Sequence, residues 1–205
     1  MIRILIHGIT TKTDALAAAK LGANGLGFIL DKSDERYIEF TLARDILHDL
    51  PPVMCNFLQV DDYDTELLRN MVQKLRIGAL IIPIEAYKTE FESLGCRLTL
   101  TGTAEEILDH ASTTAAKRQY LPRDVELGQL HDKSAQALQI WRDVNEAHHL
   151  LIPCKAEPAT LPTLLDRFKP AGLFFQGGTE SHTGLQDYPR IQAYIQAIHS
   201  IVERV

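Results

Sequence analysis

Short apolar runs alternate along this chain with segments whose apolar residues recur at helical spacing. The first apolar run covers residues 2–7 and stops at His7-Gly8. An alanine-rich segment from about residue 13 to residue 21 follows, Gly22 closes it, and a second apolar run covers residues 25–30. This order predicts a strand, a helix and a second strand. Because a helical crossover separates the two strands, we expect them to be parallel.

The same unit recurs to the end of the chain. Further strands are expected over residues 53–60, 78–84, 96–100, 117–121, 150–153 and 172–175, and further helices over residues 42–50, 65–75, 87–94, 104–110, 134–147, 161–168 and 188–205. Eight units of about 25 residues, with no linker-like stretch between them, predict one domain over residues 1–205. The predicted fold class is α/β, a (β/α)8 TIM barrel, in which ligands bind at the C-terminal ends of the strands.

The composition narrows the range of functions. Hydrophobic residues make up 45% and charged residues 23% of the chain, as in ordinary globular domains. The net charge of −6 gives no reason to expect nucleic acid or an anionic membrane as a partner. The sequence has neither a signal-peptide pattern nor an apolar run of membrane-spanning length. Three widely spaced cysteines predict neither a disulfide framework nor a zinc site, and they fit a cytoplasmic protein.

The N-terminal unit also carries a family resemblance. Its motif residues are Ile6-His7-Gly8-Ile9-Thr10-Thr11, Asp14-Ala15-Leu16-Ala17-Ala18-Ala19, Gly22-Ala23 and Gly27-Phe28. They resemble the opening of phosphoribosylanthranilate isomerase, an enzyme of tryptophan biosynthesis with a (β/α)8 barrel. The family opening reads Lys-Ile-Cys-Gly-Ile-Thr, so that Leu5 stands at the Lys position and His7 at the Cys position. The resemblance implies that His7 takes the place of the family's general base.

A second match follows the second predicted strand. Arg36-Tyr37-Ile38 resembles the family's Arg-Tyr-Val, whose arginine binds substrate, although Glu35 stands where the family has proline. The resemblance implies that Arg36 anchors the substrate. The alternative is a surface arginine in a solvated loop.

The match is weaker after the sixth predicted strand, where the family has an Asp general acid and then Gly-Gly-Thr-Gly. In the simplest alignment the acid falls near Leu121, and Asp124 serves only if the loop is shorter. Aligning Gly128 with the last family glycine places Asp132 on a family Asp. Asp124 and Asp132 are therefore the two candidates for the catalytic carboxylate.

The loops after strands seven and eight often bind phosphate in this fold. Gly177-Gly178 suit that use because glycines let backbone N–H groups approach a charged group closely, and Glu180 matches the family pattern in the same loop. Lys155, after strand seven, could add a positive charge, whereas the alternative for Gly177-Gly178 is a flexible surface turn. The candidates for substrate and phosphate binding are Arg36, Gly8, Gly128, Gly177, Gly178 and Glu180.

The family reaction is an Amadori rearrangement, which converts an aminoaldose into an aminoketose. A general acid protonates the furanose ring oxygen and a general base removes the C2 proton, so two groups of opposite protonation must face one substrate. An imidazole suits either task near neutral pH. We therefore expect an isomerase with no cofactor or metal, acting on a small phosphorylated substrate as a monomer or homodimer. His7 would pair with Asp124 or Asp132.

Two alternatives stay open at this point. A barrel enzyme acting on a different sugar-phosphate-like substrate is favoured by the changed base position, the changed phosphate loop and the apolar end of the fourth strand. A non-catalytic relative, either a small-molecule binder or a partner subunit, is favoured by the loss of the family's Cys, Asp and Gly-Gly loops. For His7 itself, the alternative role is a structural hydrogen bond to a neighbouring loop.

Overall fold

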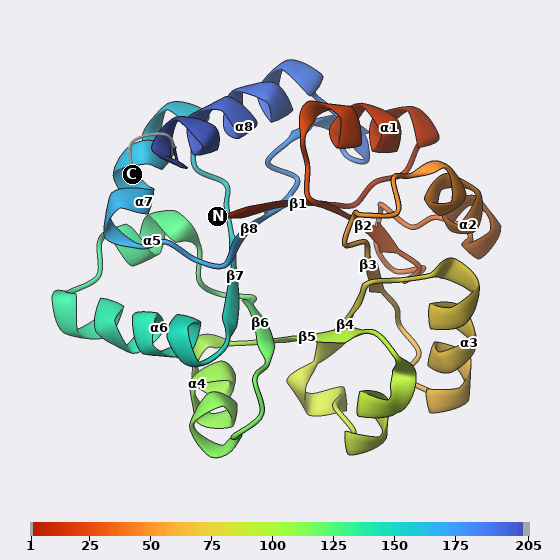
Figure 1. The fold of residues 1–205 in the computed structure, drawn as a ribbon, viewed down its shortest axis with the longest axis horizontal. Helices are drawn as coiled ribbons and strands as arrows, with labels where there is room; N and C mark the ends of the chain where they lie inside the picture. The colour runs from red at the N-terminus through yellow and green to blue at the C-terminus, as the bar shows by residue number, and fades with distance from the viewer. Residues whose placement is uncertain (1, 203–205) are drawn as a thin grey trace.

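Eight parallel strands close into a ring in the computed structural model, which describes residues 2–202 (Figure 1). The strands are β1 (Arg3–His7), β2 (Gly25–Ile29), β3 (Phe57–Gln59), β4 (Ala79–Pro83), β5 (Arg97–Gly102), β6 (Gln119–Pro122), β7 (His149–Pro153) and β8 (Gly172–Gln176). Each strand pairs in parallel with the next, and β8 pairs with β1 to close the barrel. The structure confirms the predicted (β/α)8 barrel.

Helices cover the outside of the ring (Figure 1). They are α1 (Lys12–Leu21), α2 (Phe40–Asp49), α3 (Thr65–Leu75), α4 (Ala104–Thr113), α5 (Leu127–His131), α6 (Ala135–Ala147), α7 (Leu161–Arg167) and α8 (Tyr188–Val202), with short 3-10 helices η1 (Ile84–Ala86), η2 (Thr89–Leu94) and η3 (Pro158–Thr160). Within residues 2–202, none of these helices combines the length and the apolar content needed to cross a membrane.

Local sequence signals explain several helix ends. The Thr11 side chain accepts a hydrogen bond from the backbone N–H of Asp14 and so caps the start of α1, while Gly22 ends that helix in the left-handed conformation with φ 115°. Thr103 and Glu106 form the reciprocal capping box at the start of α4 that their spacing predicts. These signals lie within one turn of the residues that they organise, which is why the sequence alone reveals them.

The predicted helix over residues 87–94 is wrong. The segment between β4 and β5 instead forms the two short 3-10 helices η1 and η2. Tyr87 and Lys88 adopt extended backbone conformations between them and interrupt the helical hydrogen bonding. Gly95 ends η2 in the left-handed conformation, and β5 begins two residues later.

The third predicted strand is too long, and two small elements were not predicted. β3 begins only at Phe57, because a turn closed by the Met54 N–H and the Pro51 carbonyl precedes it and leaves Val53 exposed. The unpredicted elements are α5 and a hairpin of β9 (Glu180–His182) and β10 (Leu185–Gln186). Residues 203–205 of the last predicted helix lie outside the described residues.

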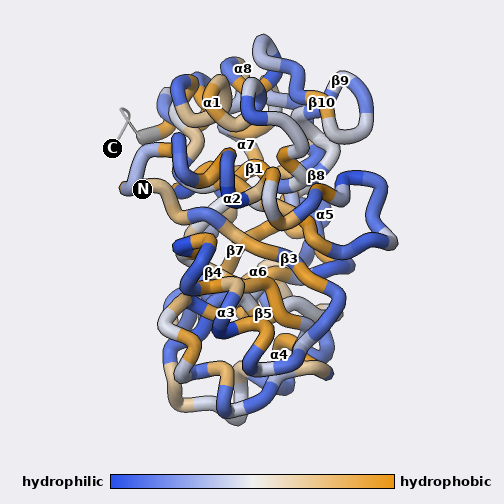
Figure 2. The backbone as a smooth tube through the Cα atoms, turned by 90° about the vertical axis from the view of Figure 1, so that its right-hand side faces the viewer, coloured by the Kyte–Doolittle hydropathy of each residue, from blue (hydrophilic) through white to orange (hydrophobic). Residues whose placement is uncertain are grey.

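The apolar residues form two clusters, one outside and one inside the ring of strands. The outer cluster packs the helices on the barrel and includes one face of α8, whose residues recur at helical spacing, namely Ile191, Tyr194, Ile195, Ile198 and Ile201. The inner cluster consists of the inward-facing residues Leu5, Phe57, Ala79, Ile81, Leu121, Leu151 and Phe174. Figure 2 shows apolar residues along the strands and polar residues at many of the connecting loops. The barrel interior is therefore a packed core rather than a channel.

We predict that Gly25→Ala destabilises the barrel by about 1–3 kcal/mol. A Cβ at Gly25 would lie 2.1 Å from the backbone oxygen of Cys55, an atom that cannot move without shifting the approach to β3. Gly128→Ala is the matched control, since a Cβ there meets nothing within 4 Å and alanine favours the helical conformation of α5. Urea unfolding measures both changes, and equal stabilities for the two variants would contradict the prediction.

Candidate active site

A pocket with a volume of about 590 Å³ opens at the C-terminal ends of the strands. Its apolar wall is made by Ile81, Pro83, Leu121, Pro153 and Phe174. Its charged lining residues are Asp31, Arg36, Arg123, Glu126 and Lys155. The pocket lies at the end of the barrel where ligands bind in this fold.

His7 ends β1 and lies beneath this pocket. It pairs in register with Gly27 on one side and Gln176 on the other. The absence of a side chain at Gly27 gives the imidazole its space, because a Cβ there would lie 2.0 Å from His7 Cδ2. The ring stacks at a tilt on Phe174, with 4.9 Å between the ring centroids, and is fully buried. His7 is therefore outside the set of described residues that line the pocket.

Burial keeps the imidazole of His7 neutral. The pKa of His7 is lowered to about 3, mainly by desolvation and to a smaller extent by the nearby positive charge of Arg36. The contact with Gln176 acts in the opposite direction but falls short of a full hydrogen bond, since neither ring nitrogen has a partner of acceptable geometry among residues 2–202. The alternative role of His7 was a structural hydrogen bond to a neighbouring loop. Its imidazole makes no such hydrogen bond within residues 2–202.

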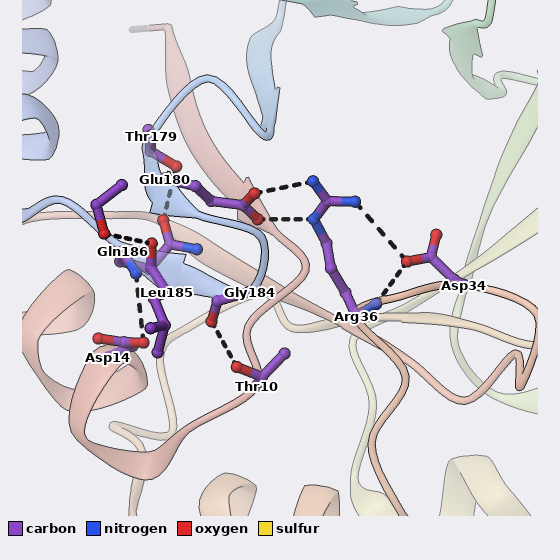
Figure 3. A network of polar contacts seen from close by, with 10 residues as sticks. Thr10, Asp14, Asp34, Arg36, Thr179, Glu180, Gly184, Leu185 and Gln186 are labelled. Atoms are coloured by element: carbon purple, nitrogen blue, oxygen red, sulfur yellow. Dashed lines mark hydrogen bonds and ion pairs between the residues drawn. The ribbon is translucent and has the colours of Figure 1, made fainter.

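Arg36 and Glu180 form a two-pronged ion pair at the edge of the site (Figure 3). The Arg36 Nε and Nη2 atoms lie 2.7 and 2.8 Å from the two carboxylate oxygens of Glu180. Asp34 lies on the other side of the guanidinium, 3.8 Å from Nη1. The hydrogen bonds that Arg36 donates to Glu180 are the main cause that raises the pKa of Arg36. Two residues predicted to bind substrate, Arg36 and Glu180, therefore lie together, but they bind each other through both oxygens of the carboxylate.

Two of the candidate glycines make room for Arg36. A Cβ on Gly8 would lie 2.4 Å from Arg36 Cδ, so the aliphatic part of the arginine passes directly over the end of β1. A Cβ on Gly177 would lie 3.4 Å from Arg36 Nη2, and both glycines have positive φ angles, 83° and 76°. These glycines therefore leave space for the arginine whose charge acts on His7.

The opening motif anchors the hairpin that carries Glu180. The Thr10 hydroxyl donates to the Gly184 carbonyl, and Asp14 accepts from the Gln186 N–H (Figure 3). Asp14 also accepts a hydrogen bond from the Tyr188 hydroxyl. Asp14 is buried, although it belongs to the first turn of α1. The motif that carries the family resemblance therefore also fixes the position of the Arg36 partner.

Neither predicted catalytic aspartate faces the pocket. Asp124 is exposed and accepts a hydrogen bond of 2.7 Å from the backbone N–H of Ala104, at the start of α4. Asp132 is exposed at the far end of α5, because that helix begins directly after Glu126 and carries the chain away. Neither aspartate is among the described residues that line the pocket. Leu121 points inward at the end of β6, as the simplest alignment implies.

Sequence reasoning missed the two carboxylates that do line the pocket, Asp31 and Glu126. Asp31 follows β2, and its Oδ1 atom accepts from the backbone N–H of Ser33 at 2.8 Å. Glu126 caps α5 and lies 2.8 Å from Lys155 Nζ. Their position just after strand ends is the signal that could have identified them.

The loops after β7 and β8 meet as predicted, whereas Gly128 lies elsewhere. A Cβ on Gly178 would lie 3.1 Å from the Cys154 carbonyl oxygen and 3.8 Å from Lys155 Cα. Gly128 is part of α5, and a Cβ there meets nothing within 4 Å. It therefore does not belong to the close contact between the loops after β7 and β8.

Each cation in the pocket lining already has a carboxylate partner. Arg36 pairs with Glu180 and Lys155 pairs with Glu126. Arg123 lies 3.2 Å from Glu85 and 3.1 Å from Glu106. An anionic ligand must therefore compete with protein carboxylates at this end of the barrel. Across the described part of the chain, no group of three or more His, Cys, Asp or Glu side chains could hold a metal ion.

The comparisons with known proteins point to one family. No protein-family model matches the chain. N-(5'-phosphoribosyl)anthranilate isomerase of Chlorobium phaeobacteroides is 23% identical over 97% of this chain and 98% of that protein. The enzyme of the same name from Thermosynechococcus vestitus is 25% identical over 98% of this chain and 93% of that protein. A crystal structure of phosphoribosyl anthranilate isomerase, in complex with reduced 1-(o-carboxyphenylamino)-1-deoxyribulose 5-phosphate, shares the fold with a TM-score of 0.79, 20% identity, and coverage of 98% of this chain and 100% of that one.

We predict that replacing His7 flattens the acid dependence of stability. The pKa of His7 is about 3 in the folded protein and about 6.5 in the unfolded chain. Below pH 6.5 the unfolded state binds a proton that the folded state does not, so the unfolding free energy falls by ~1.4 kcal/mol per pH unit until the pH nears 3. The variant His7→Cys lacks this contribution.

Urea unfolding from neutral pH down to about pH 4 measures the effect. The unfolding free energy of the unmodified protein should fall more steeply with acidification than that of His7→Cys, because all other titrating groups are shared. Parallel curves for the two proteins would show that His7 is not held neutral by burial.

Proposed function

We propose that this chain is a divergent member of the phosphoribosylanthranilate isomerase family and that it catalyses the same type of reaction, converting a small phosphorylated aminoaldose into an aminoketose. The observation that carries the proposal is the inward-facing, neutral His7 at the end of β1, the position of the family's general base. The pocket above it, about 590 Å³, has the size of a small-molecule site.

In this proposal His7 removes the C2 proton of the substrate. A neutral imidazole has a free lone pair, and neither nitrogen of this ring is engaged by a hydrogen bond of acceptable geometry among the described residues. Arg36 passes over Gly8, the residue after His7, and its charge lowers the pKa of His7. Movement of Arg36 toward a substrate anion would weaken this effect and raise the pKa of His7 toward the range that a general base requires.

The proton donor is assigned to Glu126 rather than to Asp124 or Asp132. Glu126 lines the pocket, whereas both aspartates are exposed away from it. In the free protein Glu126 is ion-paired with Lys155, so its role as donor requires that the substrate phosphate replaces it as the partner of Lys155 and that Glu126 takes up a proton. We place the substrate phosphate beside Gly178 and Lys155, where the loops after β7 and β8 meet.

A second candidate function is binding of a phosphorylated small molecule without isomerisation. It is favoured by Leu121, an apolar residue that points inward near where the family alignment places the general acid. The complete burial of His7, which is not among the described residues that line the pocket, favours it as well. We infer a cytoplasmic location for either function, because Cys55, Cys96 and Cys154 are free thiols.

We predict turnover of phosphoribosylanthranilate by the purified protein, with a loss of roughly 10²- to 10⁴-fold in His7→Ala. Thermal stabilisation by the reduced aminoketose analogue supplies a separate measure of binding in both proteins. Rescue of a tryptophan auxotroph that lacks this isomerase tests the activity in cells. Binding without turnover would support the second candidate, and neither binding nor turnover would overturn both.

We predict that Glu180→Gln tightens the binding of the reduced aminoketose analogue by roughly tenfold, equivalent to ~1.4 kcal/mol. The carboxylate of Glu180 competes with the ligand for the guanidinium of Arg36, and a neutral amide competes less. Glu66→Gln is the matched control, because it removes a 2.8 Å ion pair with Arg69 on α3, away from the pocket lining.

Isothermal titration of the three proteins with the analogue measures this change. The control should bind like the unmodified protein. Weaker binding by Glu180→Gln would show that Glu180 positions Arg36 for the ligand instead of competing with it.

A further inference from the structure

A second, smaller cavity of about 190 Å³ opens at the opposite end of the barrel. Its wall includes Arg97, Gln119 and His149, the first residues of β5, β6 and β7, together with Lys117 and Arg118 from the segment before β6. Gln119 pairs in register with Thr99 and His149, so the side chains of adjacent strands lie next to one another at this level of the barrel. The proposed isomerase reaction uses none of these residues.

Gln119 carries unused hydrogen-bonding groups into this cavity. The residue is only 2% exposed, and neither its amide nitrogen nor its amide oxygen has a partner among residues 2–202. The hydroxyl of Thr99, next to Gln119 in the register, likewise lacks a partner among the described residues. A buried amide without partners costs stability, so the native sequence is expected to provide this one with a ligand or a water molecule.

The cavity is positively charged in a chain whose net charge is −6. Arg97 and Lys117 have no carboxylate within ion-pair distance in the described part of the chain, in contrast to the paired cations of the large pocket. Glu92 is the acidic residue of the lining, and Arg118 neutralises it at 2.7 Å. Two unpaired cations and one buried amide donor therefore face the same small volume.

The positive charges around the cavity also affect the pKa of His149. Burial is the main cause that lowers the pKa of His149, and Lys117, Arg3 and Arg97 lower it further through their positive charges, with His148 as a smaller cause. An anion placed among these cations would oppose that effect. The ring of His149 is therefore a natural reporter of an anion in the cavity.

We propose that this cavity is a binding site for a phosphate group, with Arg97 and Lys117 pairing with its charge and the Gln119 amide donating a hydrogen bond to one of its oxygens. Two cations suit a dianion, and donors on two strands and the segment before the second of them suit a tetrahedral group. The enclosed volume of about 190 Å³ fits inorganic phosphate or a small phosphate monoester. A ligand that binds only the folded protein stabilises it by mass action. This ligand would do so at the end of the barrel that the proposed reaction does not use.

Nuclear magnetic resonance titration tests the proposal site by site. Inorganic phosphate and ribose 5-phosphate are the two probes, and ribose is the uncharged comparison. We expect both phosphates, but not ribose, to shift the side-chain amide signals of Gln119 and to raise the pKa of His149. Tighter binding of ribose 5-phosphate than of inorganic phosphate would identify a phosphorylated metabolite as the ligand, and the reverse order would identify the free ion. Signals of Gln119 and His149 that stay fixed at millimolar phosphate would overturn the proposal.

Matched variants separate this site from the large pocket. Arg97→Gln/Lys117→Gln should weaken the phosphate effect on Gln119 by roughly tenfold or more. Lys20→Gln/Lys74→Gln removes the same charge from the last turns of α1 and α3, outside the cavity lining, and should leave it unchanged. Loss of the effect in Lys155→Gln but not in Arg97→Gln/Lys117→Gln would assign the phosphate to the large pocket and overturn the proposal.

A neutral substitution supplies a further measurement that does not depend on surface charge. Gln119→Leu removes both unpartnered amide atoms at similar volume, so we expect a higher melting temperature without phosphate and a smaller stabilisation by phosphate. An unchanged stabilisation by phosphate in Gln119→Leu would contradict the assigned role of the amide.

Discussion

Closure of the barrel through the β1–β8 ladder is the constraint on which the rest of this structure depends. The pairing of Arg3–His7 with Gly172–Gln176 fixes which side chains of both strands point into the barrel. It places His7 beside Gln176 and under the path of Arg36, where water cannot reach the imidazole. The neutral state of His7 therefore results from how the ring of strands closes rather than from any one neighbour.

The same closure divides the barrel interior into an apolar middle and two polar ends. Inward-facing residues such as Leu5, Phe57 and Leu151 fill the middle and separate the two cavities. At the C-terminal end the cations of the pocket lining are paired with carboxylates, whereas Arg97 and Lys117 at the other end have no such partner among the described residues. Of the cations that line the two cavities, those without a carboxylate partner among residues 2–202 therefore lie at the end that the proposed reaction does not use.

Arg36 connects ligand binding with access to His7. Its side chain lies over the end of β1 next to His7, and its guanidinium is held by Glu180 on a hairpin that Thr10 and Asp14 anchor. A ligand that offers its own anionic group can replace Glu180 as the partner of the guanidinium. Substrate binding and exposure of the proposed base would then be a single event, which ties reactivity to the presence of the correct anion.

The sequence by itself determined the fold and the local signals that build it. Apolar periodicity predicted the barrel, and the capping box of Thr103 and Glu106 follows from residues three positions apart. The prediction from apolar periodicity failed over residues 87–94, where the extended residues Tyr87 and Lys88 interrupt the helix. Only the tertiary structure decided the site, because the pairing of Arg36 with Glu180 joins residues 144 positions apart and the burial of His7 depends on the closed ring. Asp124 and Asp132 were selected from their positions in the sequence alone. Whether a carboxylate lines the pocket depends on the path of the loop and of α5, which only the tertiary structure shows.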